Sequence, residues 1–220
     1  MNWLAKLLFY LLSIVLHPLL LIVVLWLVFY SFNPYAFGFN DWKAQTFKAT
    51  TFRLFIGTTF LPGLAFILVR KLGLIENLRM NGTKERIVPL TIACLFYFWI
   101  YLNVSENSIF PNYFQQVLLG VCLTLLLSFL FAIFTRVNLF AASSISLVMA
   151  FIISEVGAHR HYFFLDGRVL LESQWLIWGM VCLMGLYLSL RLYLGRSSLQ
   201  ETTAGIATGL GGQLIAAIIM

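Results

Sequence analysis

Residues 113–135 read YFQQVLLGVCLTLLLSFLFAIFT and contain no charged side chain. A helix needs about 20 mostly apolar residues to cross the hydrocarbon core of a bilayer, so this stretch can span a membrane. Six further segments of the same kind predict a polytopic membrane protein. They are residues 7–32, 52–69, 87–104, 139–157, 174–190 and 202–220.

The composition of the whole chain agrees with this prediction. Of 220 residues, 61% are hydrophobic and 10% are charged, whereas soluble domains have roughly 25% charged residues. These values exclude a soluble cytosolic enzyme, a disordered chain and a secreted disulfide scaffold. Because the segments leave no room for a soluble domain, we expect one transmembrane domain over residues 1–220. It should be an all-α integral membrane bundle of six to seven transmembrane helices.

Three of the predicted spans contain a proline. Pro18 and Pro62 lie inside their spans and should kink the helices, whereas Pro89 should sit harmlessly in an opening turn. His17 directly precedes Pro18. Because an imidazole is costly to bury in lipid, we expect His17 to face the bundle and to satisfy a backbone carbonyl freed by the proline.

Two predicted helices carry stripes of small residues, which let helix backbones approach closely. We expect both stripes to pack within the chain. In the last span Gly205 and Gly209 form a GxxxG motif. In the fifth span the small residues recur at every fourth position and are Ala142, Ser146, Ala150, Ser154 and Ala158.

The net charge of +6 comes mostly from basic residues in short loops between the apolar segments. Such flanks are typical of membrane proteins, so we expect no nucleic-acid partner. Seven spans place nine Lys and Arg residues on one side and five on the other, which favours a cytoplasmic N-terminus. If five of the nine belong to a functional site, four remain and the orientation is open.

Those five basic residues lie in three loops on one face, residues 70–86, 136–138 and 191–201. Several cations at a membrane surface can clamp an anionic headgroup, and the guanidinium fork suits phosphate. The simpler interpretation is that they snorkel and contact the lipid surface. The five residues are Lys84, Arg86, Arg136, Arg191 and Arg196.

The sequence RLYLGRSSLQETTAG at 191–205 resembles the third signature of the type-2 phosphatidic acid phosphatase superfamily. RVNLF at 136–140, KERIVP at 84–89, HPLL at 17–20 and residues 60–75 are similar to a small membrane branch found in Bacteroidota. The resemblance implies a bacterial inner-membrane protein with membrane lipids as partners. It implies a phosphate-binding site built from Lys84, Arg86, Arg136, Arg191, Arg196, Ser197 and Glu201.

Enzymes of that superfamily use one histidine as nucleophile and a second as proton donor to the leaving group. In this chain Ser197 stands at the nucleophile position, Phe140 at the proton-donor position, and Glu201 at the position of an aspartate. Phosphohistidine chemistry needs both imidazoles. We therefore expect a catalytically degenerate member that binds a lipid phosphate headgroup or serves as a non-catalytic subunit of a membrane complex.

Two alternatives stay open. One is an active lipid-phosphate phosphatase with a substituted nucleophile, for which Ser197 and His17 are the catalytic candidates. The other is a transporter for a lipid carrier, with Gln115, Gln116 and Glu155 along its path.

The remaining histidines, His159 and His161, lie close to Glu155 and Asp166 and form a weak candidate metal site. An aromatic loop at the membrane interface is the simpler interpretation. No nucleotide-binding or metalloprotease motif is present, so we expect no cofactor. The cysteines at 94, 122 and 182 lie in apolar runs and predict no disulfide.

Overall fold

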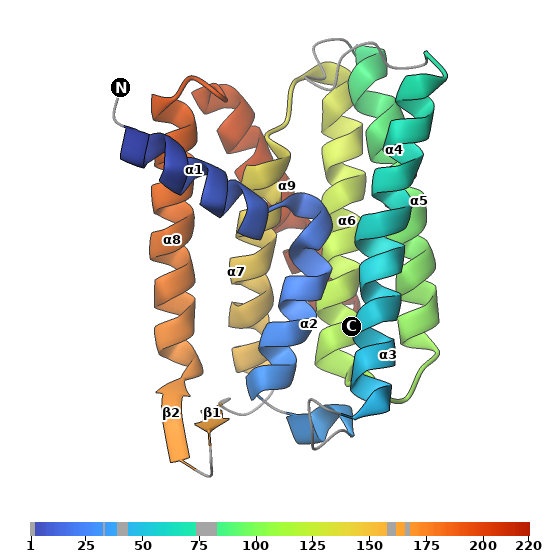
Figure 1. The fold of residues 1–220 in the computed structure, drawn as a ribbon, viewed down its shortest axis with the longest axis vertical. Helices are drawn as coiled ribbons and strands as arrows, with labels where there is room; N and C mark the ends of the chain where they lie inside the picture. The colour runs from blue at the N-terminus through green and yellow to red at the C-terminus, as the bar shows by residue number, and fades with distance from the viewer. Residues whose placement is uncertain (1–2, 33, 39–43, 74–82, 158–161, 166–167) are drawn as a thin grey trace.

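The computed structural model describes residues 3–32, 34–38, 44–73, 83–157, 162–165 and 168–220. Over these ranges the chain is an all-α bundle, as predicted, with one small β-hairpin (Figure 1). The helices are α1 Trp3–Val15, α2 Leu21–Phe32, α3 Gln45–Phe55, α4 Leu61–Lys71, α5 Thr83–Ser105, α6 Asn112–Phe134, α7 Leu139–Gly157, α8 Ser173–Tyr193 and α9 Leu199–Ile219. Short 3₁₀ turns occur at Pro18–Leu20 and Pro34–Phe37, and a π-helical turn at Ile56–Phe60 joins α3 to α4.

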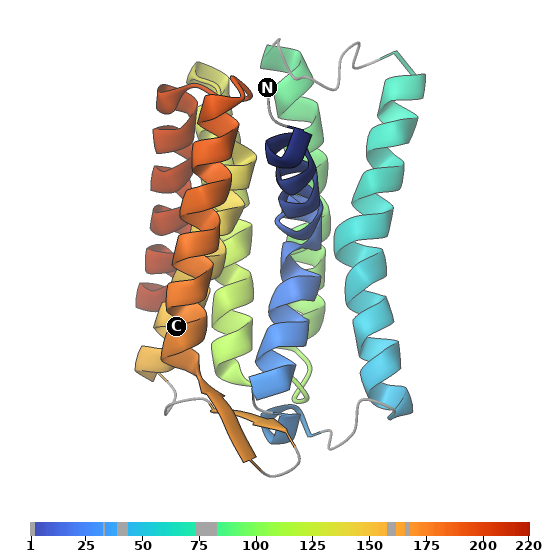
Figure 2. The same cartoon turned by 60° about the vertical axis from the view of Figure 1, so that its left-hand side comes forward.

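Five helices are long and apolar enough to cross a membrane, and two shorter apolar helices lie beside them. From α2 onward the helices run alternately up and down along one axis, with α3 and α4 forming one continuous segment (Figures 1 and 2). The chain is therefore an integral membrane protein. The five long helices are Gln45–Lys71, Glu85–Ser105, Asn112–Phe134, Gln174–Tyr193 and Leu199–Ile219, and the shorter ones are Pro18–Phe32 and Leu139–Glu155.

The prediction that residues 7–32 form one kinked helix is wrong, because the structure has two separate helices there. α1 ends at Val15 and lies across one end of the bundle, and α2 then runs along it (Figure 1). The physical reason is Pro18, which has no N–H and cannot continue a helix without losing a hydrogen bond. α1 has 13 residues, a length of about 20 Å, which is shorter than a hydrocarbon core of about 30 Å.

The polar backbone groups at this break are satisfied by side chains from elsewhere in the chain. The Tyr97 hydroxyl donates to the Pro18 carbonyl at 3.0 Å, and the Thr59 hydroxyl donates to the Leu19 carbonyl at 2.8 Å. His17 instead accepts a hydrogen bond, from the Leu19 N–H to Nδ1 at 3.3 Å. The expectation that His17 satisfies a freed carbonyl is therefore wrong, because two hydroxyls already do so.

The other two prolines also differ from expectation. α5 begins at Thr83 rather than at residue 87, so Pro89 lies inside the helix and not in its opening turn. Pro62 directly follows the π-helical turn Ile56–Phe60 within one continuous helical segment. A π-helical turn is a common way for a helix to accommodate a disturbed hydrogen-bond ladder. At Pro62 the structure therefore has a π-helical turn where the sequence predicts a kink.

The two stripes of small residues pack against each other within the chain, as expected. Ala142 and Ser146 of α7 are buried, and α9 packs against both α6 and α7. A Cβ atom on Gly205 or Gly209 would meet the backbone oxygen of Asn138 or Ala142. The absence of a side chain at these two glycines therefore allows the close approach of α9 to α7.

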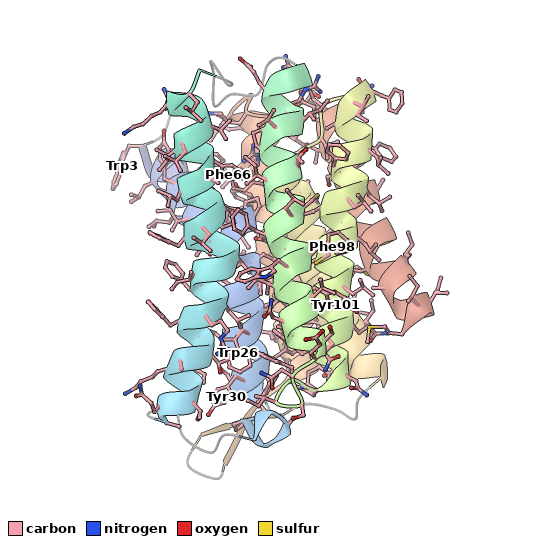
Figure 3. All side chains as sticks on the ribbon, turned by 90° about the vertical axis from the view of Figure 1, so that its right-hand side faces the viewer. Trp3, Trp26, Tyr30, Phe66, Phe98 and Tyr101 are labelled. Carbon is pink, nitrogen blue, oxygen red and sulfur yellow. The ribbon has the colours of Figure 1, made fainter. Side chains whose placement is uncertain are left out.

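The end of the bundle opposite α1 is closed by packed aromatic rings. Trp26 contacts Phe37 at 4.9 Å between ring centroids and Phe114 at 5.8 Å, and its indole N–H donates to the Thr51 hydroxyl. Trp26 and Tyr30 lie between α2 and α3 near this end (Figure 3). The rings fill the interior here, so the space for a ligand lies at the other end.

The hairpin consists of β1 Tyr162–Leu165 and β2 Arg168–Glu172, which pair antiparallel. It lies at the end of the bundle opposite α1 (Figure 1). The sequence analysis predicts an aromatic loop here and does not predict the two paired strands, which are only four and five residues long. His159 and His161 lie outside the described residues.

We expect Gly209→Ala to destabilise the protein by about 1–3 kcal/mol, because overpacking at a fixed backbone forces neighbours apart. The new Cβ would lie 2.6 Å from the Ala142 carbonyl oxygen. Gly179→Ala in α8 is the matched control, because its Cβ would meet no atom within 4 Å and alanine is the better helix former. Thermal unfolding of the purified protein in detergent, followed by circular dichroism, compares them. Equal melting temperatures would contradict the close packing.

Candidate functional site

A cavity of about 1450 Å³ opens at the end of the bundle where α1 lies, and we call it the basic cavity. Side chains from α1, α4, α5, α6, α7, α8 and α9 and from the connections between them line it. The described parts of the three loops that carry the predicted basic site, residues 70–73, 83–86, 136–138 and 191–201, all lie at this end (Figure 1). The cavity is basic because its lining includes Arg70, Lys71, Arg86, Arg136, Arg191 and Arg196.

The basic cavity brings together most of the predicted site residues. Of the seven that the resemblance implies, six line it: Arg86, Arg136, Arg191, Arg196, Ser197 and Glu201. The seventh, Lys84, belongs to the first turn of α5, but its side chain lies outside the described part of the structure. Sequence reasoning missed Arg70 and Lys71 as site residues, although both lie in one of the three loops that it singled out.

Arg191 of α8 is the most constrained of these cations. Its Nη1 donates to the Tyr187 hydroxyl at 3.1 Å, and its guanidinium lies 4.3 Å from the centroid of the Phe140 ring. Its Nε is buried and has no hydrogen-bond partner, and no carboxylate pairs with Arg191 in the described part of the chain. A buried donor without an acceptor is destabilising. The side chain nevertheless lines the basic cavity, so an anion there would compensate the charge of the guanidinium, whereas the enclosed Nε itself is not accessible to a ligand.

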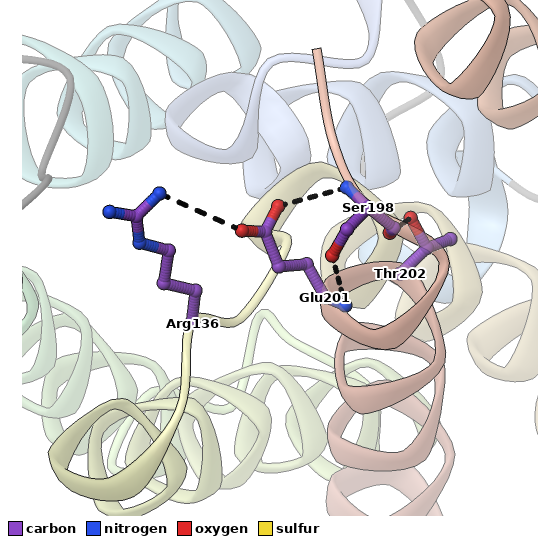
Figure 4. A network of polar contacts seen from close by, with 4 residues as sticks. All are labelled: Arg136, Ser198, Glu201 and Thr202. Atoms are coloured by element: carbon purple, nitrogen blue, oxygen red, sulfur yellow. Dashed lines mark hydrogen bonds and ion pairs between the residues drawn. The ribbon is translucent and has the colours of Figure 1, made fainter. Parts of the chain in front are cut away.

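Glu201 is the single carboxylate among the described residues that line the basic cavity, and it forms part of a helix cap (Figure 4). Its Oε2 accepts from the Ser198 N–H, and the Ser198 hydroxyl accepts from the Glu201 N–H, both at 3.1 Å. Such a reciprocal capping box satisfies two amides at a helix start. Its Oε1 lies 4.0 Å from Nη1 of Arg136.

Ser197 and Phe140 occupy the two positions where the resemblance would require histidines. The Ser197 hydroxyl oxygen accepts a hydrogen bond from the Thr202 hydroxyl at 3.3 Å, and Thr202 is not a general base. A serine hydroxyl without a neighbouring base is a weak nucleophile. Phe140 cannot exchange a proton; instead, its ring contacts both Arg191 and His17.

His17 also lines the basic cavity. Its ring meets the Phe140 ring edge to face, with 5.6 Å between centroids and an angle of 87°. The sequence analysis predicts that His17 faces the bundle. It does not predict that His17 lies beside the basic residues, because this depends on the break after Val15. Among the described residues, no group of three or more His, Cys, Asp and Glu side chains is placed to hold a metal ion.

In the part of the chain that the structure describes, the space below the basic cavity is small. A second hollow, beneath the basic cavity, has about 20 Å³, room for about one water molecule. Some buried hydroxyls and amides bond between neighbouring helices, as in the contacts of Ser128 with Thr208 and of Gln213 with Ser146. The Gln115 amide donates to the nearby Phe110 carbonyl. These contacts serve helix packing.

Fold and site together define a polytopic helical membrane protein with a basic cavity at one end of its bundle. Comparison with family models, with curated proteins and with solved structures finds no match for the chain.

The two adjacent serines should behave differently. Ser198→Ala removes the N-cap of α9 and should cost about 1 kcal/mol of stability. Ser197→Ala should leave stability unchanged, because Thr202 also donates to the Ser198 carbonyl at 2.9 Å. Melting temperatures of the two variants in detergent test this. A Ser197→Ala variant that is as destabilised as Ser198→Ala would contradict the assignment of the cap.

Proposed function

We propose that this chain is a non-catalytic membrane protein that binds the phosphate headgroup of a lipid in the basic cavity. The observation that carries the proposal is the half-buried Arg191 guanidinium, which lines a cavity together with further cations and pairs with no carboxylate among the described residues. The sequence resemblance to the phosphatidic acid phosphatase superfamily supports the same ligand chemistry. It also supports a location in a bacterial inner membrane.

The charge balance of the basic cavity favours an anionic ligand. Its described lining contains six basic side chains and one carboxylate, Glu201. Clustered positive charges in a region of low dielectric constant repel one another and are costly to desolvate unless an anion compensates them. A phosphate group, with several acceptor oxygens, matches several guanidinium groups at once.

The size and the walls of the basic cavity favour a lipid over a free ion. At about 1450 Å³ it exceeds the usual range of small-molecule pockets, about 300–1,000 Å³. Apolar side chains such as Phe9, Phe66 and Leu125 line it together with the cations. The cavity lies at the end of the spanning helices, where headgroups meet protein. An amphiphile with a phosphate head and apolar tails fits both kinds of wall.

The absence of histidines at positions 140 and 197 supports binding without hydrolysis. One observation favours the alternative, an active phosphatase with a substituted nucleophile: His17 lies in the same cavity as Ser197. Turnover of phosphatidic acid or of an isoprenyl phosphate by the purified protein distinguishes the two. Hydrolysis that His17→Ala or Ser197→Ala abolishes would replace the binding proposal by the catalytic one.

The same protein could act within a larger membrane complex, with the bound lipid as part of the assembly. No described contact identifies a partner, so this role rests on the missing catalytic histidines alone. Isolation in mild detergent, followed by mass spectrometry of the co-purified proteins and lipids, tests it.

We expect Arg191→Gln to weaken binding of a short-chain phosphatidic acid by about tenfold or more, because a hydrogen bond to a charged group contributes about 1.5–3 kcal/mol. Arg191→Lys should recover little, since lysine lacks the guanidinium fork. Arg53→Gln is the control, because Arg53 is an exposed cation of α3 outside the cavity lining. Isothermal titration calorimetry in detergent measures each affinity, with the matching diacylglycerol as a ligand without phosphate. Equal binding by Arg191→Gln and Arg53→Gln would contradict the proposal.

A further inference from the structure

We infer that His17 is a ligand-binding residue of the basic cavity, whose Nε2–H donates a hydrogen bond to the same anion that Arg191 binds. The inference rests on the proposed function, because it concerns the same site. It gives His17 a role in addition to capping the turn at Pro18.

The first step concerns the proton of the imidazole. His17 Nδ1 accepts a hydrogen bond from the Leu19 N–H at 3.3 Å, so Nδ1 carries no proton. A neutral imidazole has one protonated nitrogen, which must then be Nε2. The turn at Pro18 thereby fixes His17 as a donor at its distal nitrogen even when the ring carries no charge.

The second step concerns what Nε2 can reach. Among the described residues Nε2 has no hydrogen-bond partner, and it is not a fully buried atom. Tyr97 and Thr59 already satisfy the Pro18 and Leu19 carbonyls, so the nearby backbone does not require His17 as a donor. Because His17 lines the basic cavity, the acceptor left for Nε2 is whatever occupies that cavity.

The third step concerns the position of the ring relative to Arg191. Phe140 packs edge to face with His17 at 5.6 Å and lies under the Arg191 guanidinium at 4.3 Å. One aromatic ring thus holds both donors against the same wall of the cavity. A phosphate bound where the Arg191 guanidinium lines the cavity would have further oxygens to accept from the imidazole.

Two substitutions separate the roles of the two ring nitrogens. His17→Asn keeps a short acceptor able to cap the turn but lacks the distal donor. His17→Gln places an amide N–H near the position of Nε2 and gives up the cap. The probes are a short-chain phosphatidic acid and inorganic phosphate, titrated into the purified full-length protein in detergent, with a melting temperature for each variant.

We expect His17→Asn to bind the phosphatidic acid about tenfold more weakly while melting like the wild type. His17→Gln should bind within about threefold of the wild type even though the lost cap lowers its melting temperature. Inorganic phosphate should show the same order of variants, and weaker binding than the lipid would identify the apolar walls as a second source of affinity.

Three results would overturn parts of this assignment, and they can be told apart. If His17→Asn binds as tightly as the wild type while Arg191→Gln binds weakly, His17 is not a ligand. If His17→Gln loses as much affinity as His17→Asn, only the fold around residue 17 matters and the inference fails. If the wild type binds neither probe, the proposed function itself fails.

Discussion

A backbone carbonyl inside a membrane must find a donor within the protein, and this constraint governs the structure at Pro18 and Leu19. Tyr97 of α5 and Thr59 of the π-helical turn supply the two donors. With these bonds the chain can end α1 at Val15, turn, and enter the bundle as α2. Without them the break would leave polar groups in an apolar environment. The position of α1 across the end of the bundle therefore depends on two hydroxyl groups from distant parts of the chain.

That break also makes the two ends of the bundle different. At one end the rings around Trp26 fill the interior. At the other end α1 lies across the helices instead of along them (Figure 1), and the basic cavity remains open between α1, α4, α5 and α8. The helices α6, α7 and α9 form the rigid wall, because glycines and small residues bring their backbones together. This wall carries Arg136 on the connection between α6 and α7, whereas Arg191 lies on the neighbouring helix α8.

The sequence was sufficient to predict most of the spans, because long apolar runs bounded by charges have few other structures in a membrane. It was also sufficient to predict that the three basic loops lie on one face of the membrane, since this follows from the order of the spans. It could not predict the break at Pro18, because the donors that permit it lie 79 and 40 residues away in the chain. Nor could it predict that Phe140 contacts both His17 and Arg191, which depends on how side chains of α7 and α8 pack against the turn between α1 and α2.

The capping box at the start of α9 couples the beginning of that helix to the basic cavity. Both carboxylate oxygens of Glu201 have neighbours: one accepts from Ser198 and the other faces Arg136. A substitution at Glu201 would therefore remove a helix cap and the negative charge beside Arg136 in one step. At this position the stability of α9 and the charge of the cavity cannot be changed independently.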